Sequence, residues 1–184
     1  MGSASTRRAW RRPTRGFIVV DDHLRTSADH VWAAGDVAGS AQFTHASWHD
    51  FRVLRVNLTG GDATTAGRLV PYTVFTTPEL ARVGLTEKEA RARGHEIRVA
   101  RLDVAAIPRA KTLQVRTGTW KAVVDAASDA ILGVALLGHD SGEVMTAVHM
   151  AMLGGLRYPQ VRDAVIAHPT MGEGLNLLFD TLSK

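Results

Sequence analysis

The 184-residue chain contains no cysteine. It can therefore form no disulfide and carries no thiolate nucleophile of its own. The sequence also lacks a Gly-x-Gly-x-x-Gly phosphate loop. No apolar run approaches the ~20 residues that a membrane-spanning helix needs. These absences exclude disulfide-stapled scaffolds and cysteine-based catalysis by the chain alone, and we expect no membrane contact.

The composition is that of an ordinary globular protein, with 45% hydrophobic and 22% charged residues. Its length predicts one or two domains with a substantial core. We expect a cytoplasmic protein.

The net charge of +4 is concentrated at the N-terminus. The first fifteen residues carry no acidic residue and five arginines: Arg7, Arg8, Arg11, Arg12 and Arg15. A nucleic-acid-binding arm, a transit peptide and a disordered tail share this composition. Because no nucleic-acid motif follows and the run has no apolar face, we expect residues 1–15 to be a disordered basic tail, with no nucleic acid as partner.

The segment Thr26–Asp36 is the most informative stretch of the chain. Its residues Val31–Ala34 predict a short strand that ends at the pair Gly35-Asp36. Ligands of open α/β sheets lie beyond the carboxyl ends of the strands. Glycine permits close backbone approach there, and aspartate accepts hydrogen bonds from ligand hydroxyl groups. The pattern predicts a ligand site.

A second cluster lies near the C-terminus, in the sequence His168-Pro169-Thr170-Met171-Gly172-Glu173. Proline is favoured at the first position of a helix, so we expect His168 at the mouth of a helix and Glu173 one turn inside. An imidazole oriented by a carboxylate is a general acid/base arrangement. A capping histidine without catalytic function is the alternative.

Together with the intervening segment Val74–Glu87, these motifs resemble the pyridine nucleotide-disulfide oxidoreductases, the flavoprotein family of lipoamide dehydrogenase, glutathione reductase and mercuric reductase. The resemblance implies that Asp36 holds a ribityl hydroxyl of FAD, next to Gly35. It implies that Thr44 and His45, at a helix start, face the flavin ring. It also implies that His168 and Glu173 serve the redox dithiol of the partner subunit.

The resemblance runs from about Gly16 to the C-terminus and corresponds to the last third of a full-length family member. The redox cysteines and the glycine-rich loops for FAD and NAD(P)H are missing. We therefore expect the N-terminal FAD and NAD(P) domains to be needed for activity, and we expect the chain alone to retain no FAD. A non-catalytic homodimerisation module is the alternative function.

The fold class expected is α+β: an antiparallel-sheet dimerisation domain with flanking helices over residues 68–184, preceded over residues 16–67 by the C-terminal remnant of an α/β FAD-binding domain. The remnant should contain strands at Phe17–Val20 and Val31–Ala34, a helix at about Gln42–Leu58 and a linker at Asn57–Gly67. The second domain should contain strands at Tyr72–Thr76 and Ile97–Val104 and a capped helix at Thr86–Gly94. It should also contain a hairpin of Thr119–Asp125 with Ile131–Leu137 and two apolar helices at Val144–Met152 and Leu175–Leu182.

We expect a homodimer, because so small a domain should be unable to bury the apolar stripes of both Val144–Met152 and Leu175–Leu182. We expect no metal site: His45 and His49 have ligand spacing, but no third ligand is evident. The segments Phe43–Trp48 and Leu69–Tyr72 are similar to those of mercuric reductases, whose C-terminal cysteine pair is absent here. The substrate therefore stays open.

Overall fold

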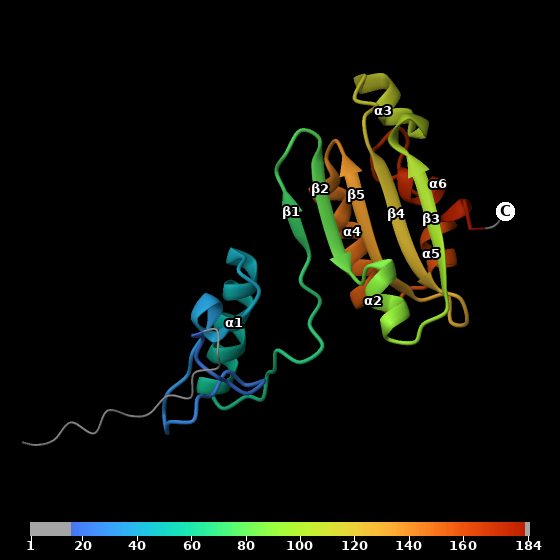
Figure 1. Cartoon of the computed structure of the whole chain (residues 1–184). Helices are drawn as coiled ribbons and strands as arrows, with labels where there is room; N and C mark the ends of the chain where they lie inside the picture. The colour runs from blue at the N-terminus through green and yellow to red at the C-terminus, as the bar shows by residue number, and fades with distance from the viewer. Residues whose placement is uncertain (1–15, 183–184) are drawn as a thin grey trace, which may run out of the picture. The chain divides into compact units, whose positions relative to one another are not determined.

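The computed structural model describes residues 16–182 (Figure 1). The chain divides into two compact units, with the boundary between Val70 and Pro71. Unit 1 comprises residues 16–70 and unit 2 residues 71–182. The basic run of residues 1–15 lies outside the described residues, so a disordered tail there stays a prediction. No helix of the described part is long and apolar enough to cross a membrane.

Unit 1 is built around the helix α1, Thr44–Leu58, which confirms the helix predicted at 42–58. A short 3-10 turn, η1 (Gly35–Ala38), packs against it. The apolar side chains that this unit buries are few and lie in the loops and on one side of α1: Leu24, Ala33, Ala46 and Val53.

The two strands predicted in unit 1 were wrong. Within residues 16–70, the bridge between Arg25 and Trp32 is the sole strand-like pairing, and neither Phe17–Val20 nor Val31–Ala34 forms a strand. Their backbones make isolated hydrogen bonds instead, such as the one that Ile18 N donates to Val37 O at 2.7 Å. A strand needs a neighbour along its whole length to pair its N–H and C=O groups. The described part of unit 1 supplies none.

Unit 2 contains an antiparallel five-stranded sheet in the order β1-β2-β5-β4-β3. The strands are β1 Tyr72–Val74, β2 Glu79–Gly84, β3 Ile97–Asp103, β4 Thr119–Asp125 and β5 Ile131–Gly138. The hairpin β4–β5 forms in the predicted place. The α+β class with an antiparallel sheet is confirmed.

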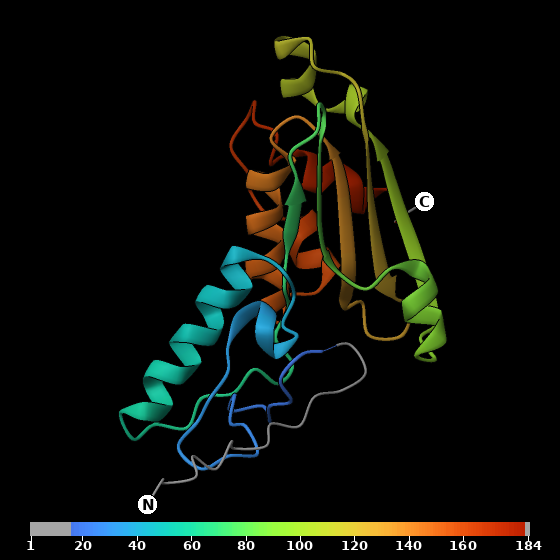
Figure 2. The ribbon, with the colours of Figure 1, turned by 60° about the vertical axis from the view of Figure 1, so that its left-hand side comes forward.

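The helices of unit 2 are α2 Glu87–Ala92, η2 Val104–Ala106, α3 Pro108–Leu113, α4 Ser141–Leu153, α5 Tyr158–Arg162 and α6 Gly174–Asp180. Helices α4, α5 and α6 cover one face of the sheet, and α2 lies on the other (Figures 1 and 2). The predicted capping box of α2 is confirmed, because Thr86 and Glu89 bond each other reciprocally. Glu87 fastens α2 to the sheet through Lys121 Nζ at 2.9 Å.

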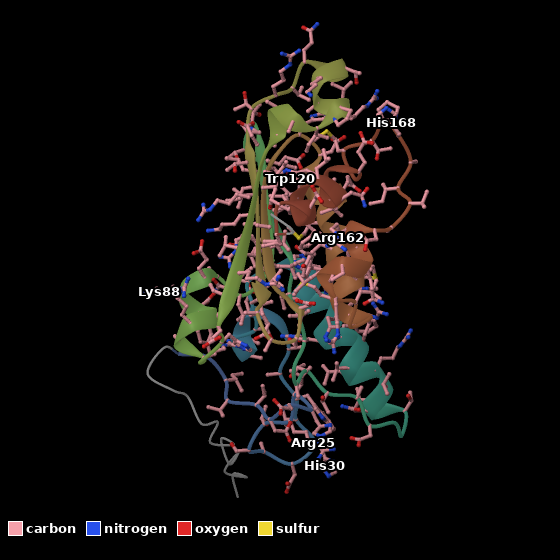
Figure 3. The ribbon with its side chains drawn as sticks, turned by 90° about the vertical axis from the view of Figure 1, so that its right-hand side faces the viewer. Arg25, His30, Lys88, Trp120, Arg162 and His168 are labelled. Carbon is pink, nitrogen blue, oxygen red and sulfur yellow. The ribbon has the colours of Figure 1, made fainter. Side chains whose placement is uncertain are left out.

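The core of unit 2 centres on Trp120, which is fully buried between the sheet and α6 (Figure 3). The first residue of α6, Gly174, lies so close that a Cβ there would be 2.6 Å from the indole carbon Cζ3. Any larger residue would push α6 off the sheet. The other large apolar side chains buried in unit 2 include Ile107, Leu136, Met145, Leu178 and Phe179.

The sheet accommodates both apolar helices, and the contrary expectation was wrong. Helix α4 buries Val144, Met145 and Val148, while α6 buries Leu175, Leu178 and Phe179. Five strands are wide enough for the two helices to lie side by side, α4 over β2 and β5 and α6 over β3 and β4. The stripes on these helices are therefore core of the single chain, and the case for a dimer must rest on other surfaces.

Asp125 anchors the turn between β4 and β5. Its carboxylate accepts hydrogen bonds from Ser128 Oγ at 2.7 Å, from His95 Nδ1 at 2.8 Å and from Ser128 N at 2.8 Å. These bonds, that from the Ser128 hydroxyl first, hold the pKa of Asp125 well below its ordinary value of 3.8. The folded state thus favours the ionised carboxylate.

We expect Asp125 to make unit 2 sensitive to acid. A carboxyl group whose folded pKa is depressed contributes stability above its unfolded pKa, and this contribution is lost as the pH falls from about 4 downward. Urea unfolding of the wild type and of Asp125→Ala should therefore differ at pH 7 and converge toward pH 2. A difference that is constant across this range would contradict the assignment.

Candidate functional site

The two residues predicted to act as an acid/base pair, His168 and Glu173, are hydrogen-bonded to each other in unit 2. The Nδ1 atom of His168 lies 2.7 Å from Oε2 of Glu173. The imidazole is 69% exposed, whereas the carboxylate is only 12% exposed. Figure 3 shows His168 on a loop at the outside of unit 2. An Nδ1–H that donates to the carboxylate leaves Nε2 as the basic nitrogen, which is the arrangement that a general acid/base needs.

The local geometry of this pair differs from the prediction. His168 and Pro169 belong to a loop, joined by a cis peptide bond, and the helix α6 begins only at Gly174. Glu173 occupies the N-cap position and does not lie inside the helix. The expectation that Pro169 starts a helix was wrong, because residues 168–173 are not helical and the helix starts five residues after Pro169.

Three further side chains, two of them in the same motif, hold this loop and the segment that precedes it. Thr170 Oγ1 accepts a hydrogen bond from Glu173 N at 3.2 Å and donates to Ala167 O at 2.8 Å. Met171 is buried and anchors the middle of the loop. Asn176 Nδ2 donates to the carbonyl oxygens at the end of α5, those of Val161, Arg162 and Ala164. Side-chain-to-backbone bonds of this kind are not visible as a periodic pattern.

The predicted ligand site of unit 1 is a tight turn. Gly35 has φ +69°, a conformation that favours glycine, and it is buried against α1. Asp36 follows directly and its side chain is exposed. The peptide N–H of Gly39 closes the turn on Asp36 O at 3.0 Å. An exposed carboxylate on a hydrogen-bonded turn is suited to accept hydrogen bonds from ligand hydroxyl groups.

Thr44 and His45 are the first two residues of α1, and both are exposed. The imidazole of His45 stacks on the ring of Phe43, with centroids 5.2 Å apart. The N-terminal end of a fifteen-residue helix carries partial positive charge, which favours an electron-rich ligand.

His49, the other member of the His45 pair considered for a metal, lies deeper in unit 1. Its Nδ1 atom is 3.3 Å from the guanidinium of Arg68. Burial, followed by the charge of Arg68, lowers the pKa of His49. A neutral imidazole that faces a guanidinium is a structural contact, because a second cation would be repelled there.

Asp50 is a further residue of unit 1 that sequence reasoning missed. Its side chain is fully buried, yet it is acidic. It accepts hydrogen bonds from Gly35 N and Ser40 Oγ and forms an ion pair with Arg68. The sequence gives no sign that this carboxylate is buried, because the residues that bind it are 10 or more positions away in the chain.

The candidate residues fall into two groups, one in each unit. Gly35, Asp36, Thr44 and His45 belong to unit 1, and His168 with Glu173 to unit 2.

Comparison with known proteins decides the family. A profile of the pyridine nucleotide-disulphide oxidoreductase dimerisation domain matches residues 70–178, and a second profile of the same family matches residues 6–50. The chain belongs to the pyridine nucleotide-disulphide oxidoreductase family. The match at 70–178 identifies unit 2 as the dimerisation domain of this family.

The relatives are longer proteins. The chain is 49% identical to the probable pyridine nucleotide-disulfide oxidoreductase RclA of Escherichia coli, over 90% of this chain and 38% of RclA. It is 34% identical to a mercuric reductase of Bacillus cereus, over 93% of this chain and 27% of that protein. A solved Cu(II) complex of RclA, described as an HOCl-induced flavoprotein disulfide reductase, superimposes with a TM-score of 0.88 at 47% identity, over 93% of this chain and 40% of that structure.

Proposed function

We propose that the chain supplies the C-terminal part of an FAD-dependent pyridine nucleotide-disulfide oxidoreductase of the cytoplasm, which passes electrons from NAD(P)H to a disulfide or a metal ion. The observation that carries this proposal is the hydrogen-bonded pair of His168 and Glu173, on the unit that matches the family's dimerisation domain. The chain spans about two-fifths of the length of its relative RclA, so the nucleotide-binding loops and the redox thiols belong to the remainder of such an enzyme.

The turn and the helix start of unit 1 fit a flavin in chemical terms. FAD would supply hydride and electron transfer. The carboxylate of Asp36 would accept a hydrogen bond from a ribityl hydroxyl, while Gly35 lets the turn that carries Asp36 pack closely on α1. The positive end of α1, at Thr44 and His45, would stabilise negative charge on the ring. Nothing in the sequence provides a pyrophosphate cradle, so these residues complete a flavin site but do not make one.

His168 would move a proton. With Nδ1 held by Glu173, its Nε2 can take a proton from a thiol and return it to a leaving thiolate. Glu173 fixes the orientation of the ring through this hydrogen bond. This chain has no thiol, so the pair would act on cysteines that lie outside it, in the partner subunit of a homodimer.

A fusion protein tests the proposal. The part of Escherichia coli RclA that precedes the aligned region would be joined to Gly16 of this chain. The fusion should hold about one FAD per chain and oxidise NADH or NADPH. The 184-residue chain by itself should be colourless and inactive. A yellow, active chain would overturn the view that the remaining parts are needed.

A non-catalytic dimerisation module is the second candidate, and the missing cysteine favours it. In the same experiment, a fusion that folds and dimerises but holds no FAD would support this alternative and contradict the proposed oxidoreductase.

The outer surface of α4 supports a homodimer. The side facing away from the sheet exposes Met150 at 56% and Leu153 at 58%, and Leu156 just beyond the helix at 40%. An uncharged, apolar strip on a dimerisation domain is suited to pair with its own copy about a two-fold axis.

We expect Leu153→Asp to weaken self-association by ~100-fold or more, because two like charges would meet at the interface. Light scattering over a dilution series would measure this, with circular dichroism to show that the fold is kept. Leu113→Asp, on α3, is the control, since Leu113 is 38% exposed and lies outside the strip. Equal dissociation of both variants, or of neither, would contradict the proposed interface.

A further inference from the structure

The carboxylate of Asp50 ties together the Gly35-Asp36 turn. Its Oδ2 atom accepts two hydrogen bonds, from Gly35 N at 2.7 Å and from Ser40 Oγ at 2.7 Å. These donors stand at the two ends of the turn, whose backbone is closed by Ser40 N donating to Gly35 O at 3.3 Å. One buried oxygen atom therefore clamps both ends.

The helix α1 presses on the same peptide. A Cβ on Gly35 would lie 2.7 Å from Ser47 Oγ, so the backbone of Gly35 rests directly on the helix. Ser47 and Asp50 are three residues apart and share one face of α1. The peptide of Gly35 is thus held in place by its contact with Ser47 and by its hydrogen bond to Asp50. Asp36 is the next residue, so this contact fixes the backbone position from which its exposed side chain extends.

Arg68 completes the clamp from the far end of unit 1. Its Nη1 donates to Asp50 Oδ1, and its Nη2 donates to Ser40 Oγ at 3.1 Å. Burial raises the pKa of Asp50, but the hydrogen bonds from Ser40, Gly35 and Arg68 outweigh burial and lower the pKa. Asp50 is therefore ionised at neutral pH, and the charge-assisted bonds to it are strong ones.

We propose that Asp50 is a positioning residue that, clamped by Arg68 and Ser40, orients the Gly35-Asp36 turn so that Asp36 presents its carboxylate to a polyol hydroxyl. The inference rests on the proposed function, in which this polyol is the ribityl chain of FAD. Asp50 itself is buried and does not touch the ligand.

A double-mutant cycle in the RclA fusion tests the proposal. The FAD dissociation constant would be measured for the wild type, Asp50→Asn, Asp36→Ala and the double variant. Because Asp50→Asn removes the charge that holds Gly35, it should weaken FAD binding by ~10- to 100-fold. In the Asp36→Ala background the same substitution should change little, since the residue through which Asp50 acts is gone.

Additive losses would overturn the proposal, because substitution of a merely structural residue would weaken FAD binding by the same factor with and without Asp36. Asp62→Asn is the matched control: Asp62 is 86% exposed in the same unit and should leave FAD binding unchanged.

A second measurement needs no flavin and separates this inference from the proposed function. In the 184-residue chain, hydrogen exchange of the Gly35 amide should accelerate at least ~10-fold in Asp50→Asn and stay unchanged in Asp36→Ala. Unchanged protection of Gly35 in Asp50→Asn would refute the clamp. If protection is lost as expected but the wild-type fusion binds no FAD, the clamp stands and the proposed function fails.

Discussion

Replacing Phe179 with aspartate is expected to unfold unit 2. The ring is fully buried on α6 and contacts Tyr158, with centroids 6.0 Å apart. Removal of a buried phenylalanine ring costs about 3–5 kcal/mol. The aspartate adds an unpaired buried charge. A domain of this size has a free energy of unfolding of only ~5–15 kcal/mol, so the combined loss approaches this entire value.

Circular dichroism and urea unfolding would measure the effect. Leu177→Asp is the matched control, because Leu177 lies two residues before Phe179 on α6 and is 38% exposed. It should leave the fold intact. If Phe179→Asp yields a folded monomer, then α6 contributes to a subunit interface, and the assignment of its stripe to the core is wrong.

Replacing His168 with glutamine is expected to abolish most turnover of the RclA fusion. General acid/base catalysis contributes about 10²–10⁴-fold, and kcat should fall by that factor. Glutamine fills similar space but cannot exchange the proton. Flavin content and assembly should be unchanged, because the imidazole is 69% exposed and packs against little else.

Glu173→Gln should reduce kcat less than His168→Gln does, because the imidazole keeps its proton-transfer chemistry and loses only the carboxylate that holds its Nδ1 atom. His139→Gln is the control, an exposed histidine outside the pair, and should keep wild-type kcat. Full activity of His168→Gln would show that the proton is moved by another group.

Much of unit 2 could be predicted from local patterns. The hairpin of β4 and β5, the capping box at Thr86 and Glu89 and the helix α4 are specified by alternation, by cap residues and by helical periodicity. All these signals act between residues close in sequence. The same holds for α1, whose boundaries differ from the prediction by two residues at most.

The errors arise where the deciding partner is distant. Phe17–Val20 has the composition of a strand, but its state depends on a neighbouring strand, which residues 16–70 do not supply. The loop of His168 is held by Thr170 and Asn176, whose hydrogen bonds to backbone carbonyls no periodicity reveals. Whether a helical stripe is core or interface depends on the width of the sheet beneath it.

The sequence alone determined the family and the α+β class and predicted that His168 and Glu173 lie together, because motifs, caps and hydrophobic periods are local properties. Tertiary structure alone decided that α6 belongs to the core, that Glu173 stands at the N-cap of α6, and that Asp50 holds the turn that contains Asp36. These outcomes depend on burial and on hydrogen bonds between distant residues. A buried carboxylate is stable only when its donors meet it in space, and that meeting is a property of the folded chain.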